Sequence, residues 1–202
     1  MKNKFLLVAL LFISCFSFSQ SYVTYNFGEK GQIKIPNDWT IFDGKSDKEI
    51  IKKAVIASNG RYQPTPGKYT IIRCNGYNGQ KSFTLKLSYI VLEQSQTASE
   101  LRAQKDDIIE ILNGQMVDLK RQVIGSDIKI IKSFPIEYKE IGGGIGGKMS
   151  YIKQHNIKPK RKIVQYMLFK DNKMFLLTLG WDVVDEDIWS DKYNAIVNSL
   201  KF

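Results

Sequence analysis

The chain has 202 residues, of which 43% are hydrophobic and 25% charged, and a formal net charge of +10. This composition is ordinary for a folded chain, and the length suits one domain with a sizeable core. One histidine and two cysteines cannot supply a structural zinc site, so we expect no metal and no cofactor.

The first part of the chain has the pattern of a secretory signal peptide. Lys2 and Lys4 give it a positive start, and residues 5–13 form an unbroken apolar run. Ser17 and Ser19 supply small residues at the −3 and −1 positions of a cleavage site after residue 19. We therefore predict an exported protein, periplasmic or secreted, which disfavours ATP, NAD and nucleic acid as partners.

A second interpretation of the same segment stays open. Residues 12–15 resemble a bacterial lipoprotein signal, in which Cys15 is acylated and becomes the new terminus. Under either interpretation, nine apolar residues are too short to span a hydrocarbon core of ~30 Å, so we expect no transmembrane segment. The mature part, residues 20–202, is predicted to be a single domain.

The first half of this domain is predicted to contain strands and one short helix. The expected strands cover residues 22–27, 32–35, 39–42, 68–74 and 82–92, with a turn over 75–79. Between them, Ser46 and Glu49 have the spacing of a capping box, which predicts a helix ending near Asn59 and Gly60.

The second half opens with the longest predicted helix. It begins near Thr97, with a capping-box partner at Glu100, is expected to bend at Gly114, and ends at Gly125. Extended structure follows over 127–141, interrupted at Pro135, then over 148–155, 163–170 and 173–181. The last two form a hairpin over Asp171 and Asn172, and a helix over 185–200 closes the chain.

These elements indicate an α+β fold. Two or three amphipathic helices and about seven strands are most simply buried as an α/β/α sandwich around a mostly antiparallel sheet. The strands 163–170 and 173–181 are apolar on both faces, which is typical of central strands covered on both sides.

The sequence Ile33-Lys34-Ile35-Pro36-Asn37-Asp38-Trp39 resembles the opening of the PsbP-like superfamily. The closing order is also similar, with a strand hairpin and then a helix ending in residues 196–200 before Phe202. The superfamily includes a photosystem extrinsic subunit, a Ran-binding nuclear factor and bacterial envelope proteins. The resemblance implies a sandwich that usually binds other proteins and rarely does chemistry, and it brings no catalytic residues with it.

A glycine-rich stretch over residues 142–147 precedes Lys148 and matches most of a P-loop. A P-loop continues with Ser or Thr and a helix, whereas Met149 follows here and the next residues are predicted to be a strand. We interpret the stretch as a flexible connection between strands. Gly143, Gly144 and Gly146 are then candidates for partner binding.

A basic cluster lies between the strands predicted over 148–155 and 163–170. It contains Lys158, Lys160, Arg161 and Lys162, and Pro159 keeps it extended. We expect these charges to point into water, where they either attract an anionic partner or form a solvated turn.

A catalytic site has little support from the residue types. Cys74 is expected to be a small core residue, and a hydrolase would have to recruit His155, the single histidine, without a G-x-S-x-G elbow. The acidic residues of segment 182–191 fit helix capping better than calcium binding.

Three hypotheses of function follow. The first is an exported, non-catalytic accessory protein that binds an unidentified protein through one face of the sandwich. The second is a binder of an anionic envelope polymer or lipid head group through residues 158–162. The third, and the weakest, is a hydrolase.

Overall fold

The computed structural model describes residues 21–42 and 68–202. The elements before the long helix are β1 (Tyr22–Phe27), β2 (Gly31–Pro36), β3 (Thr40–Phe42), β4 (Lys68–Asn78) and β5 (Lys81–Val91). The later elements are α3 (Ala98–Ala103), α4 (Lys105–Gln122), β6 (Ile128–Ser133), β7 (Glu137–Ile141), β8 (Gly144–His155), β9 (Arg161–Lys170), β10 (Lys173–Asp182), η1 (Val183–Asp185) and α5 (Glu186–Ser199). The predicted signal peptide and the helix predicted near residues 46–60 lie outside the described residues.

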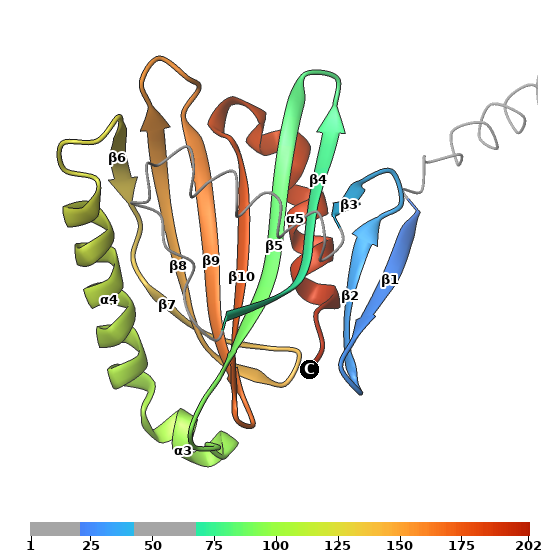
Figure 1. Ribbon diagram of the computed structural model, residues 1–202, viewed down its shortest axis with the longest axis vertical. Coiled ribbons are helices and arrows are strands. Elements are labelled where there is room, and N and C mark those ends of the chain that lie inside the picture. Colours follow the sequence, from blue (N-terminus) through green and yellow to red (C-terminus); the bar gives the residue numbers. More distant parts are fainter. Residues whose placement is uncertain (1–20, 43–67) are drawn as a thin grey trace, which may run out of the picture.

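Eight strands form one open, antiparallel sheet. Its order is β3-β4-β5-β10-β9-β8-β6, and β7 pairs with β8 beside β6. Short turns join the neighbouring strands β4 and β5, β8 and β9, and β9 and β10, the last of these hairpins turning over Asp171, whose φ is 53°. The described chain therefore has the predicted α+β sandwich around an antiparallel sheet (Figure 1).

Helices cover both faces of this sheet and create two cores. On one face, Leu101, Ile108, Leu112 and Met116 of α3 and α4 pack on side chains of β8 and β9. On the other face, Trp189 and Ile196 of α5 pack on β4, β5, β9 and β10. The β1–β2 hairpin lies on the α5 side (Figure 1). The two faces are assigned by the alternation of side chains along each strand.

The C-terminal residues join three parts of the α5 side. Lys201 exchanges backbone hydrogen bonds of 3.0 and 2.9 Å with Gln32 of β2. The amide of Phe202 donates to the carbonyl of Gly142 at 2.9 Å, and the Phe202 ring packs 4.3 Å from that of Phe175. These contacts attach α5, the β1–β2 hairpin and the β7–β8 turn to the same edge of the sandwich.

Two local predictions were wrong. The turn expected over residues 75–79 is strand up to Asn78, because Gly76 leaves room for the Trp39 ring against β4. The long helix does not bend at Gly114, which lies inside α4; the interruption is at Gln104, between α3 and α4. Glycine lowers helix propensity, but it keeps its amide and so does not break the hydrogen-bond ladder.

The glycine-rich stretch is not the flexible connection that we predicted. Its turn consists of Gly142 and Gly143, with φ of 59° and 88°, and Gly144–Gly147 are buried residues of β8. A Cβ at Gly146 would collide with the backbone carbonyl of Met167 in β9, and one at Gly147 would collide with Leu112 of α4. The glycines thus permit close packing, and Lys148 lies in a strand.

Candidate functional site

A cleft of about 560 Å³ opens between α5 and the sheet, over β8 and β9. It is lined by Phe134, Pro135, Glu137, Lys148, Ser150, Lys162, Val164, Trp181, Glu186, Ser190, Tyr193 and Asn194. We call this hollow the α5 cleft. Its lining combines apolar side chains with charged and hydroxyl groups, which is the usual make-up of a ligand site.

The local structure explains why these side chains meet. In β8, Lys148 and Ser150 point toward the cleft, whereas the alternate residues Met149 and Tyr151 belong to the α4 core. On α5, residues 186, 190, 193 and 194 recur at helical spacing and form one face. Ser150 is only 4% exposed, so it lies at the bottom of the hollow.

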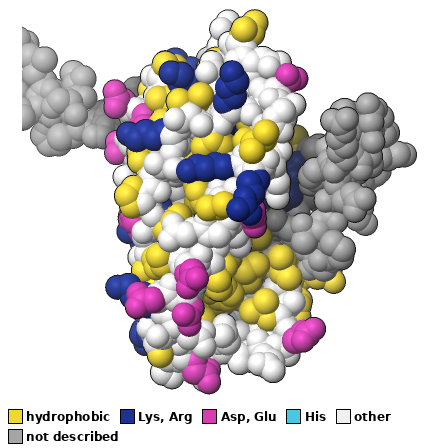
Figure 2. Space-filling view, turned by 90° about the vertical axis from the view of Figure 1, so that its left-hand side faces the viewer, with side chains coloured by type: hydrophobic (Ala, Val, Ile, Leu, Met, Phe, Trp, Pro, Cys, Tyr) yellow, Lys and Arg dark blue, Asp and Glu magenta, His cyan; other side chains and the backbone are white. Residues whose placement is uncertain are grey.

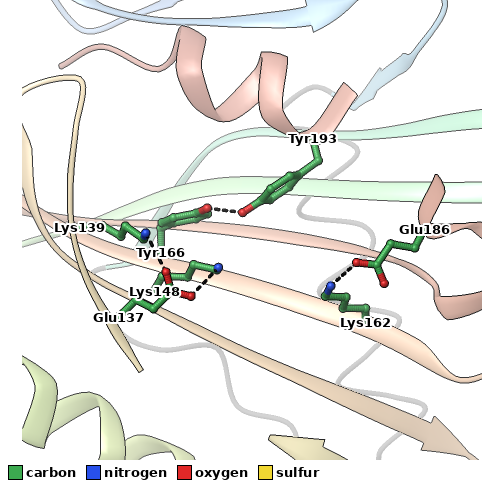
Figure 3. A network of polar contacts seen from close by, with 7 residues as sticks. All are labelled: Glu137, Lys139, Lys148, Lys162, Tyr166, Glu186 and Tyr193. Carbon is green, nitrogen blue, oxygen red and sulfur yellow. Dashed lines mark hydrogen bonds and ion pairs between the residues drawn. The ribbon is translucent and has the colours of Figure 1, made fainter. Parts of the chain in front are cut away.

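One carboxylate at the cleft holds two lysines. Glu137 of β7 accepts from Lys148 at 2.8 Å and from Lys139 at 2.7 Å (Figure 3). Hydrogen bonds from Lys139 and Lys148 lower the pKa of the Glu137 carboxyl, because they favour its charged form. This corner of the cleft therefore keeps one positive charge in excess.

Two further contacts join α5 to the strands. Lys162 of β9 pairs with Glu186 at the start of α5, and the hydroxyls of Tyr166 and Tyr193 share a hydrogen bond (Figure 3). Burial, followed by the bond to Tyr193, raises the pKa of Tyr166, so this phenol remains neutral.

Aromatic rings lie beneath the lysines. The Lys162 ammonium is 5.6 Å from the centre of the Phe134 ring and 5.7 Å from that of Trp181, and Lys132 approaches Phe134 to 4.8 Å. These distances allow cation–π attraction. The lining itself contains two lysines and two glutamates, and Lys132 and Lys139 stand beside it, so the excess of positive charge lies next to the cleft.

The predicted basic cluster is divided by the fold. Lys158 and Lys160 are exposed in the β8–β9 turn, as expected. Arg161 and Lys162 are half-buried in β9, so the prediction that their charges point into water was wrong. Arg161 donates to the Gly180 carbonyl at 3.0 Å and lies 3.5 Å from Asp182, while Lys162 enters the α5 cleft. Successive strand residues point to opposite faces, which explains the division.

The other candidate residues do not gather at one place. Cys74 is buried in β4, and burial raises the pKa of its thiol to about 12. His155 ends β8, and three strands separate β8 from β4. At about 4.8 Å per strand, Cys74 and His155 are at least ~19 Å apart and cannot act together. Of the three glycine candidates, Gly143 is exposed in its turn, and Gly144 and Gly146 are buried.

Acidic residues near α5 form ion pairs with the sheet. Asp185 is 3% exposed and accepts from Lys81 of β5 at 2.8 Å. Asp182 is paired with Arg161, and Glu186 with Lys162. These carboxylates attach the start of α5 to β5 and β9.

Sequence reasoning missed most of the α5 cleft. Glu137, Ser150 and Trp181 were not singled out, and Lys148 was considered only as part of a P-loop. A signal was present, because Lys148 and Ser150 are polar alternate residues in segment 144–151 of β8, whose other residues are glycine or apolar and buried. The partners of these residues come from other elements and depend on sheet register.

No described helix combines the length and hydropathy that are needed to cross a bilayer. No protein-family model and no curated protein sequence matches the chain.

Solved structures are similar at low identity. The solution structure of cyanobacterial PsbP (CyanoP) from Synechocystis is 12% identical, with a TM-score of 0.51, and the match covers 90% of this chain and 92% of that one. LpqN, involved in cell envelope biogenesis of Mycobacterium tuberculosis, is 12% identical with a TM-score of 0.44, and 90% of each chain is covered. The Ran-binding protein Mog1p of Saccharomyces cerevisiae is 10% identical with a TM-score of 0.38, covering 90% and 95%. At such identities the likeness concerns the fold alone, and this chain has a PsbP-like fold.

Proposed function

We propose that this chain is an exported, non-catalytic binding protein that receives an acidic segment of a partner protein in the α5 cleft. The observation that carries the proposal is the hollow between α5 and β8–β9, which is lined from six separate parts of the chain and has Lys132 and Lys139 beside it. Export rests on the signal-peptide pattern of residues 1–19.

The cleft has suitable size and charge for this role. Its volume of about 560 Å³ is enough for several side chains of an inserted segment. The side chains of Glu137 and Glu186 remain 42% and 43% exposed, so a competing carboxylate has access to their lysines. Phe134 and Trp181 offer apolar contact beside those charges.

The hydrogen bonds of the cleft favour binding over catalysis. An activated hydroxyl needs an adjacent base that accepts its proton. Lys148 and Lys162 instead donate to Glu137 and Glu186, and Tyr166 is held neutral by burial and by Tyr193. The two lysine–glutamate pairs therefore fix the positions of charged groups in the cleft, and no hydroxyl of these contacts is activated as a nucleophile.

Affinity capture from an envelope extract of the producing cell tests the proposal. Ser190→Trp fills the cleft from its α5 wall, and Asn113→Trp adds the same ring to the opposite helix as a matched control. We expect a defined partner to be retained by the wild type and by Asn113→Trp, and to be lost by Ser190→Trp. Retention by all three proteins would contradict the proposal.

Charge variants sharpen the test with the captured partner. Lys148→Met removes a cation and is expected to weaken binding about three- to tenfold, whereas Glu137→Gln releases two lysines and is expected to strengthen it. Rising salt should reduce both differences. Changes of the same sign in the two variants would exclude an acidic segment.

A further inference from the structure

The three most exposed large hydrophobic side chains of the described chain lie at one end of the sandwich. Ile157 is 99% exposed, Val184 85% and Ile124 80%, while the other exposed large hydrophobic residues do not exceed 54%. Scattered exposed apolar residues need no explanation, but three extreme cases in neighbouring loops do.

Backbone hydrogen bonds tie these three loops together. The amide of Asn156, beside Ile157, donates to the carbonyl of Asp127 at 2.9 Å, which attaches the β8–β9 turn to the loop after α4. The amide of Val183, beside Val184, donates to the carbonyl of Lys160 at 2.9 Å. All three loops lie at the upper end of the molecule in Figure 1. We call the surface of residues 121–129, 156–160 and 183–187 the apical surface.

Cations surround the aliphatic side chains. Lys158 and Lys160 are exposed and form no ion pair with a residue of the described ranges 21–42 and 68–202. Arg121 and Lys129 are also exposed, against the exposed carboxylates Asp127 and Asp187. Figure 2 shows hydrophobic side chains at the top of the molecule, with Lys and Arg side chains just below them. Arg121 is paired with Asp118, and Asp185 and Glu186 are paired with Lys81 and Lys162, so the excess of positive charge beside the apolar tips comes from Lys158 and Lys160.

We propose that the apical surface docks on a bilayer that contains anionic lipids. Ile124, Ile157 and Val184 enter the boundary between head groups and acyl chains, and Lys158 and Lys160 contact lipid phosphates. Peripheral membrane binding uses this pair of contributions, buried apolar area and attraction to anionic head groups. An anionic polymer would use the lysines alone and would leave the aliphatic side chains in water.

Vesicle co-sedimentation tests this proposal. The predicted mature chain, residues 20–202, is compared with its variants, so that neither Cys15 nor the apolar run of residues 5–13 contributes to binding. The probes are vesicles of phosphatidylcholine with and without phosphatidylglycerol. One double variant, Ile124→Ser with Ile157→Ser, removes two apolar side chains. A second double variant, Lys158→Ala with Lys160→Ala, removes two positive charges. Ile111→Ser with Val117→Ser changes equally aliphatic, half-exposed positions of α4 and is the control.

We expect both apical variants to lose at least about tenfold in partition to the phosphatidylglycerol vesicles, and the control to bind as the wild type does. Binding to pure phosphatidylcholine should be weak for every variant. Heparin serves as a soluble polyanion. The proposal fails if the double serine variant binds vesicles and heparin like the wild type while the double alanine variant loses binding to both. In that case the surface is a site for polyanions. Equal losses in the α4 control would also overturn it. Ser190→Trp should bind vesicles normally, so the α5 cleft is tested separately.

Discussion

The two halves of the α5 side differ sharply in how they are filled. Over β4, β5 and β10, α5 buries Trp189 and Ile196 completely against Phe83, whose ring centre is 5.5 Å from that of Trp189. Over β8 and β9, the same helix faces the α5 cleft with Glu186 and Tyr193. One helix thus provides stability with one stripe of side chains and a binding surface with the next.

The width of the sheet accounts for this difference. A helix is ~10 Å across and strands are ~4.8 Å apart, so one helix covers only about two or three strands. The main sheet has eight strands, and α5 and the β1–β2 hairpin lie toward its β4–β5 side. The part above β8 that α5 does not reach carries the polar residues Lys148 and Ser150, whose face of the strand borders the hollow.

The largest effect is expected from a substitution in the packed half of the α5 side, over β4, β5 and β10. Trp189→Ala should lower the free energy of unfolding by about 3–5 kcal/mol, because a large, fully buried ring is replaced by a cavity. Trp189→Phe should cost less, since the indole Nε1 has no acceptor among the described residues and no hydrogen bond is lost. Urea unfolding of the two variants measures this, and equal losses would contradict this explanation.

The next effect concerns the strand that separates the two cores. Gly146→Ala should destabilise the protein by about 1–3 kcal/mol, because the new methyl collides with a backbone carbonyl of β9 that cannot rotate away. Gly114→Ala meets open space on α4 and should stabilise by about 0.5–1 kcal/mol. Opposite shifts in the melting temperature of these two variants would distinguish packing from helix propensity; a neutral Gly146→Ala would argue against the close approach.

A smaller effect is expected where the two halves meet. Tyr166→Phe and Tyr193→Phe each break the hydrogen bond between the two hydroxyls and should cost about 1 kcal/mol. The double variant should lose less than the sum, because both changes remove the same interaction. A double-mutant cycle from denaturant unfolding measures this coupling, and strict additivity would show that the bond contributes nothing.

The smallest effect is expected in the hollow half. The pKa of Glu137 is lowered in the folded chain, so its contribution to stability is present above its ordinary value of 4.5 and is lost as pH falls through the lower, folded value. The side chain is 42% exposed, so screening by water keeps this contribution below about 1 kcal/mol. The stability curves of the wild type and Glu137→Gln should stay a constant distance apart above pH 4.5 and converge as pH falls below it; a difference that does not shrink at low pH would contradict the pairing.

Much of the fold could be predicted from local patterns. The capping box of Thr97 and Glu100 is present, and Leu101, Ile108, Leu112 and Met116, which recur at helical spacing, are buried. The β9–β10 hairpin and the closing helix also lie where periodicity indicated. In contrast, Gly144, Gly146 and Gly147 suit a loop and a tightly packed strand equally well, and only the neighbouring Met167 and Leu112 distinguish the two.

The α5 cleft could not be predicted in the same way. Lys148 faces Glu137 through the register of β7 against β8, and Lys162 meets Glu186 only after α5 packs on the sheet. Neither relation is visible in local sequence. The predicted basic cluster was right in composition, but strand alternation sent Arg161 and Lys162 to opposite faces.

Site-specific photo-cross-linking in the producing cell tests the central claim most directly. A photoreactive side chain at Ser190 or Asn194 faces the α5 cleft, and one at Asn113 lies on the opposite helix. We predict that positions 190 and 194 give one discrete cross-linked protein that position 113 does not give. The same product from position 113, or no product from the cleft positions while another face cross-links, would contradict a binding role for the α5 cleft.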